Sequence, residues 1–94
     1  MKKDGSFKFG RKKNAKLIAE RGVGFEDVIA AIANGNILDI LTHHNQAEYP
    51  EQFIMIVAIN NYAYQVPFQY EEEGIYLITV FPSRKCTKQY LRGV

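Results

Sequence analysis

Several residue types and patterns are scarce in this 94-residue chain, and each scarcity narrows the class of protein. A single cysteine, Cys86, excludes a disulfide within the chain and fits a reducing compartment. The longest uninterrupted apolar run is residues 53–59, whereas a helix needs about 20 such residues to span a bilayer. The basic N-terminus has no apolar segment behind it, so we expect no secretory signal. The sequence therefore predicts a cytoplasmic protein that does not bind membranes.

The chain also lacks the residue patterns of several enzyme classes. His43 and His44 are its only histidines, and the nearby Asp39 and Glu48 complement them too weakly to specify a zinc site. There is no glycine-rich phosphate loop, no nucleophile elbow and no CxxC pair. Cys86 has no surrounding His and Asp constellation, so we expect no nucleophilic role for it. We expect neither a metal nor another cofactor.

Lysine and arginine are missing from the whole middle of the chain. Residues 1–21 carry a net charge of +6, residues 22–83 carry −8 with no basic residue, and residues 84–94 carry +4, which sums to +2. If the fold brings the two basic ends together, they form one positive surface suited to a phosphate backbone. The alternative is a solvated basic tail beside a solvated acidic face.

The residues that are abundant predict one globular domain over residues 1–94, with residues 1–5 as a flexible lead-in. The apolar fraction is 47% and the aromatic fraction 13%, both outside the disordered regime. Hydrophobic periodicity predicts a short strand within 6–10, helices over 12–21 and from 24 to about 34, strands over 37–42, 52–59, 62–70 and 75–81, and a closing helix over 84–91. The fold class is therefore α+β: an antiparallel sheet of about four to five strands, two N-terminal helices packed on it, and a short C-terminal helix.

Three local signals refine this prediction. Asn60 and Asn61 tolerate the positive φ angles of a type I′ turn, so we expect a two-residue hairpin there. Pro67 cannot donate to a ladder and marks an edge, a bulge or a gap in pairing. Ser83 is a favourable N-cap for the closing helix.

Two pairs of residues are candidates for catalysis. Arg84 and Lys88 lie four apart at the start of the closing helix, so they share one face and form a candidate clamp for a scissile phosphate. His43 or His44 is a candidate proton carrier, because an imidazole titrates near neutral pH. The alternatives are ordinary solvation of a terminal helix for the cations and a plain polar loop for the histidines.

Five further residues are candidates for binding RNA. Lys12, Lys13 and Lys16 keep their ammonium groups largely off the apolar stripe of the first helix, and Lys85 follows the clamp arginine. Tyr90 is an aromatic side chain beside basic residues, suited to stacking on a base. Its alternative role is packing, with the hydroxyl reaching water.

Three stretches resemble the RelE/ParE-like toxins of bacterial toxin–antitoxin pairs, and within them the BrnT-like branch. NAKLIAERGVGFEDV at 14–28 is similar to that branch's helix, glycine turn and second helix start, although Arg21 stands where the branch commonly has a histidine. The strands over 52–81 follow the same order. FPSRKCTKQYL at 81–91 is similar to the family's terminal S-A-R-[KR]-A-T-[KR] signature, with Arg84 as the motif arginine.

The resemblance implies a toxin that cleaves RNA without a metal and is neutralised by a cognate antitoxin protein. The target it implies is mRNA, with or without the ribosome. The apolar central strands and Pro67 suit a homodimer or a hetero-oligomer with the antitoxin equally well. Two other hypotheses stay open: a protein of this fold that acts by binding, for example on a topoisomerase, and a non-toxic protein-interaction module.

Overall fold

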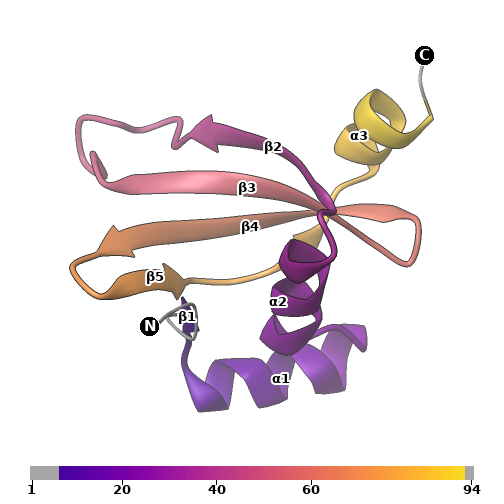
Figure 1. The fold of residues 1–94 in the computed structure, drawn as a ribbon, viewed down its shortest axis with the longest axis horizontal. Coiled ribbons are helices and arrows are strands. Elements are labelled where there is room, and N and C mark those ends of the chain that lie inside the picture. Colours follow the sequence, from indigo (N-terminus) through magenta and orange to yellow (C-terminus); the bar gives the residue numbers. More distant parts are fainter. Residues whose placement is uncertain (1–6, 93–94) are drawn as a thin grey trace.

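The computed structural model describes residues 7–92, and the lead-in expected over residues 1–5 lies outside this range. Figure 1 shows a twisted sheet with helices at both of its sides. The elements in chain order are β1 (Phe7–Lys8), α1 (Arg11–Arg21), α2 (Phe25–Ala33), β2 (Ile37–Thr42), β3 (Gln52–Ile59), β4 (Tyr62–Glu71), β5 (Gly74–Leu77), β6 (Phe81–Pro82), α3 (Arg84–Cys86) and the π-helical η1 (Thr87–Leu91). This arrangement confirms the α+β fold class.

Four strands, β2 to β5, form an antiparallel meander, as the hydrophobic pattern predicted. The order across the sheet is β1-β5-β4-β3-β2, with β6 pairing separately with β4. The β3–β4 hairpin turns at Asn60 and Asn61, whose φ angles of 53° and 64° confirm the expected turn conformation. β2 and β3 have the predicted bounds.

The sheet differs from the prediction at its other edge. β1 pairs with β5 in parallel, with Phe7 beside Ile75, so the sheet is mixed and not wholly antiparallel. The strand predicted over 75–81 is split into β5 and β6. Pro67 explains the split: its carbonyl accepts from the Ile78 amide (2.9 Å), so its nitrogen, which has no hydrogen, faces the same gap in pairing.

The two N-terminal helices meet at a tight corner. α1 ends at Gly22, which has a φ of 73° and donates its amide to the Ile18 carbonyl. A side chain of α1 helps to cap the start of α2: the Asn14 Oδ1 accepts a hydrogen bond from the Phe25 amide at 2.7 Å. The Asp27 carboxylate accepts from the Gly24 amide at 2.8 Å and completes the cap. A side chain at Gly24 would press on α1, since its Cβ would lie 2.6 Å from the Asn14 Oδ1.

Apolar side chains cover both faces of the sheet. The face toward α1 and α2 holds the larger core cluster: Leu17, Val23, Phe25, Val28, Ala31, Met55, Val57, Ile59, Val66, Phe68, Leu77 and Val80. The other face holds a smaller cluster of Ile56, Ala63 and Cys86, against which Leu38, Ile54, Tyr90 and Leu91 pack. β3 contributes to both clusters, which is why its sequence is a nearly continuous apolar run. Within residues 7–92, no helix is both long enough and apolar enough to cross a membrane.

Candidate functional site

The C-terminal helix, by which we mean α3 and η1 together, is anchored to the sheet by backbone and hydroxyl groups. The Ser83 Oγ accepts from the Cys86 amide at 3.1 Å, which confirms the predicted N-cap. The Thr87 hydroxyl is buried; it donates to the Ser83 carbonyl at 2.8 Å and accepts from the Ala63 amide at 2.9 Å. The Ser83 amide donates to the Ala63 carbonyl (3.0 Å), so the helix start continues the ladder along β4.

Most of this helix is π-helical, which periodicity alone did not predict. The Arg92 amide donates to the Thr87 carbonyl, five residues back, at 3.1 Å. Single π turns of this kind occur often at functional sites. The buried side of the helix carries Cys86, Tyr90 and Leu91 against the smaller core cluster.

The cations of the C-terminal helix point to solvent. Arg84, Lys85 and Lys88 are all exposed. Within residues 7–92, the side-chain hydrogen bonds of this helix are made by Ser83, Cys86, Thr87 and Tyr90, and not by its cations. The helix therefore presents two ammonium groups and a guanidinium on a fixed support, which suits the binding of a polyanion.

Tyr90 lies at the inner side of the same helix. Its hydroxyl donates to the Asp39 Oδ2 on β2 at 2.6 Å, and this hydrogen bond raises the pKa of Tyr90. The Asp39 Oδ1 in turn accepts from the Ile40 amide at 2.8 Å. The Tyr90 ring, a candidate for stacking on RNA, is partly buried against the smaller core cluster, and its hydroxyl holds the helix to β2.

The histidines lie apart from these cations. His43 and His44 follow the end of β2, and their rings stack on each other with centroids 4.5 Å apart. Both residues lie in the connector beyond the end of the strand, where neighbouring side chains are not held to opposite faces of the sheet. His43 is four residues beyond Asp39, where the C-terminal helix touches β2, and so about 13 Å further along the chain. The structure does not bring the four candidate catalytic residues together.

The N-terminal lysines also lie apart from the C-terminal helix. Lys12, Lys13 and Lys16 are exposed on α1. Figure 1 shows α1 beyond the β1–β5 edge, whereas the C-terminal helix lies near β2 at the opposite edge. The two helices also pack on different core clusters, on opposite faces of the sheet. The basic ends of the chain therefore form two separate positive surfaces.

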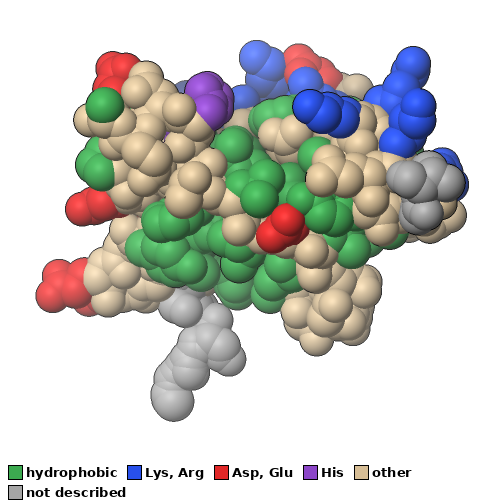
Figure 2. All heavy atoms as spheres, turned by 90° about the horizontal axis from the view of Figure 1, so that it is seen from above, with side chains coloured by type: hydrophobic (Ala, Val, Ile, Leu, Met, Phe, Trp, Pro, Cys, Tyr) green, Lys and Arg blue, Asp and Glu red, His purple; other side chains and the backbone are tan. Residues whose placement is uncertain are grey.

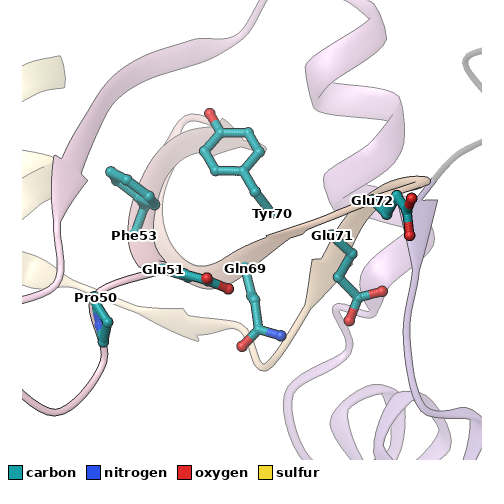
Figure 3. Close-up of a pocket in the computed structure, with 7 residues that line it drawn as sticks. All are labelled: Pro50, Glu51, Phe53, Gln69, Tyr70, Glu71 and Glu72. Carbon is teal, nitrogen blue, oxygen red and sulfur yellow. The ribbon is translucent and has the colours of Figure 1, made fainter.

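A shallow cavity of about 500 Å³ opens at the far end of the β3–β4 ladder, and sequence reasoning did not find it. Its lining consists of Pro50, Glu51, Phe53, Gln69, Tyr70, Glu71 and Glu72. Figure 3 shows that Phe53 and Tyr70 project to one side, whereas Gln69 and Glu71 project to the other. Its carboxylates would repel a phosphate, so this cavity does not extend the cationic surface.

No set of three or more His, Cys, Asp or Glu side chains that could hold a metal lies within residues 7–92. Comparisons of the chain with protein-family models, with curated proteins and with solved structures find no match. A functional assignment therefore depends on the chain's own residues and their geometry.

Proposed function

We propose that this chain is the toxin of a bacterial toxin–antitoxin pair and that it acts in the cytoplasm on RNA through the C-terminal helix. One observation carries the proposal: Arg84, Lys85 and Lys88 are exposed together on a helix that Thr87 and Tyr90 tie firmly to the sheet. A rigid cationic surface needs little reorganisation when charge develops on a bound phosphate. The cognate antitoxin would neutralise the chain by covering this surface.

The proposed reaction is cleavage by the RNA's own 2′-hydroxyl. The 2′-oxygen forms a bond to the adjacent phosphorus, the bond from phosphorus to the 5′-oxygen breaks, and the proton of the 2′-hydroxyl ends on that 5′-oxygen. The products are a 2′,3′-cyclic phosphate and a 5′-hydroxyl. Arg84 and Lys88 would bind the phosphorane-like transition state more tightly than the ground state. Because His43 and His44 lie at the other end of β2, we assign them no proton transfer at this surface.

The test is induction of the chain in a bacterial host, with growth and total RNA followed together. We expect growth arrest with discrete RNA fragments, and loss of both in the Arg84→Ala, Lys88→Ala double variant. The matched control is Lys12→Ala with Lys16→Ala, which removes the same charge from two exposed lysines four apart on α1. Fragments that persist in the first variant, or disappear equally in both, would refute the assignment of the site.

A purified assay separates binding from cleavage. For single strands the slope of log affinity against log salt concentration is about −0.7 per phosphate contact. The Arg84→Ala, Lys88→Ala variant lacks two such contacts, so its slope should be less negative than that of the wild type by about 1.4. Cleavage should continue in EDTA and leave cyclic phosphate ends. Growth arrest with intact RNA would favour the alternative of a binding toxin with another target, and normal growth would refute the toxin hypothesis.

A further inference from the structure

β2 is an open edge of the sheet and carries an unusual share of exposed apolar surface. It is the last strand in the order β1-β5-β4-β3-β2. Ile37, Ile40 and Leu41 on this strand are 37%, 46% and 41% exposed. Figure 2 views the molecule from the β2 side and shows hydrophobic side chains gathered in the middle of that surface, with lysine and arginine along one border. Open edges with apolar side chains pair readily with another strand.

The backbone of β2 alternates between the sheet and solvent. The His43 amide donates to the Gln52 carbonyl on β3 at 3.2 Å, so Leu41 and Asp39, two and four residues earlier, also face β3. The intervening Ile40 and Thr42 direct their amides and carbonyls outward. The Ile40 amide donates a hydrogen bond to the Asp39 Oδ1 at 2.8 Å. In the unpaired strand this bond satisfies one of the outward-facing amides and so makes the edge less ready to pair.

We propose that β2 pairs with β2 of a second copy of this chain, antiparallel and with Leu41 opposite Leu41. This register makes the strand complementary to itself across a two-fold axis. Ile40 of each copy exchanges both backbone hydrogen bonds with Thr42 of the other, and the two Leu41 side chains meet at the axis. Asp39 of each copy lies opposite His43 of the other, on the same face as Leu41.

The polar groups that lose a hydrogen-bond partner in this pairing each gain a new one. The Ile40 amide leaves the Asp39 Oδ1 for the Thr42 carbonyl of the second copy, which frees that carboxylate oxygen. The His43 Nδ1 already accepts from the Asn45 amide at 3.0 Å, so its ring proton is on Nε2 and can be donated to the freed oxygen. A register centred on Ile40 would instead place the Asp39 carboxylate opposite Leu41 and leave its Oδ1 without a donor.

The pairing does not depend on the proposed function, but it bears on it. The two-fold axis of an antiparallel edge pair is perpendicular to the sheet, so both copies present the same face to the same side. The two C-terminal helices, with Arg84, Lys85 and Lys88 of each copy, would then lie on one face of the continuous sheet.

The first test is the mass of the full-length chain by sedimentation velocity over a concentration series. Pairing of two six-residue strands buries less surface than the roughly 800 Å² per partner of a stable interface. The dimer is therefore expected to be weak, and the series must extend to high micromolar concentrations. We expect a dimer whose dissociation constant rises at least about tenfold in Leu41→Glu, since two carboxylates would face each other at the axis. Ile18→Glu is the control, because Ile18 on α1 is similarly exposed (48%) and lies outside the pairing.

The second test reads the register directly. Residues 41 of the two copies form a non-hydrogen-bonded pair, whose Cα atoms are about 4.5 Å apart and within reach of a disulfide. Under mild oxidation Leu41→Cys should form covalent dimers, whereas Ile40→Cys should not. Monomers at every concentration, a dimer that Leu41→Glu does not weaken, or faster cross-linking at residue 40 than at 41 would overturn the proposal.

Discussion

Replacing Thr87 with valine should loosen the C-terminal helix from the sheet without changing the shape of the side chain. Thr87 is 2% exposed, and its hydroxyl is the acceptor for the Ala63 amide, which is itself fully buried. The Ala63 carbonyl binds the Ser83 amide, so both polar groups of Ala63 face the helix start and not β3. Valine offers no acceptor there. A buried donor left unpaired costs about 1–3 kcal/mol.

The assay is thermal and urea unfolding of the full-length chain. In domains of 60–100 residues each kcal/mol shifts Tm by about 4–8 °C, so Thr87→Val should lower Tm by roughly 5–20 °C. Thr87→Ser is the matched control; it keeps the hydroxyl and removes one methyl group, at about 1 kcal/mol. The Ala63 amide should also exchange its hydrogen faster in Thr87→Val than in Thr87→Ser. A valine variant as stable as the wild type, with an equally protected Ala63 amide, would refute the reasoning.

Three further predictions concern two other polar anchors and the β3–β4 turn. Asn14→Ala should lower the free energy of unfolding by about 0.5–2 kcal/mol, because the Phe25 amide loses its cap, and urea unfolding should show Asn14→Asp much less affected. The hydrogen bond to Asp39 raises the pKa of Tyr90. This hydrogen bond therefore stabilises the fold fully below the usual pKa of a tyrosine, and its contribution is lost as the pH rises through the raised pKa of Tyr90. A tyrosinate absorbance titration should place the difference between wild type and Tyr90→Phe above about pH 10; a difference at lower pH would contradict the contact. At Asn61, where φ is 64°, valine should be about 1–2 kcal/mol less stable than glycine in thermal unfolding, and equal stabilities would contradict the turn.

The sequence by itself determined the elements whose signals are local. The strand-like run of residues 37–42, the nearly continuous apolar run of 52–59 and the flanking turn residues predicted β2 and β3 with the bounds observed. The Asn60–Asn61 turn and the Ser83 cap were predicted because positive φ angles and helix N-caps each favour a few residue types. Exposure of Arg84 and Lys88 was likewise predictable, since a charged side chain is rarely buried without a partner.

Only the tertiary structure decided what depends on contacts between distant residues. The parallel pairing of Phe7 with Ile75 joins residues far apart in the chain, and no local pattern encodes it. The same holds for the position of β2 at the sheet edge, which follows from the order of the strands. It holds also for the separation of His43 from the C-terminal helix, which follows from the point at which that helix contacts β2. The π turn lies in a helix held by two contacts, from Thr87 to Ala63 and from Tyr90 to Asp39, each of which spans a long stretch of chain. Local periodicity fixes which residues form a strand or a helix, whereas the packing of the whole chain fixes which of their side chains meet.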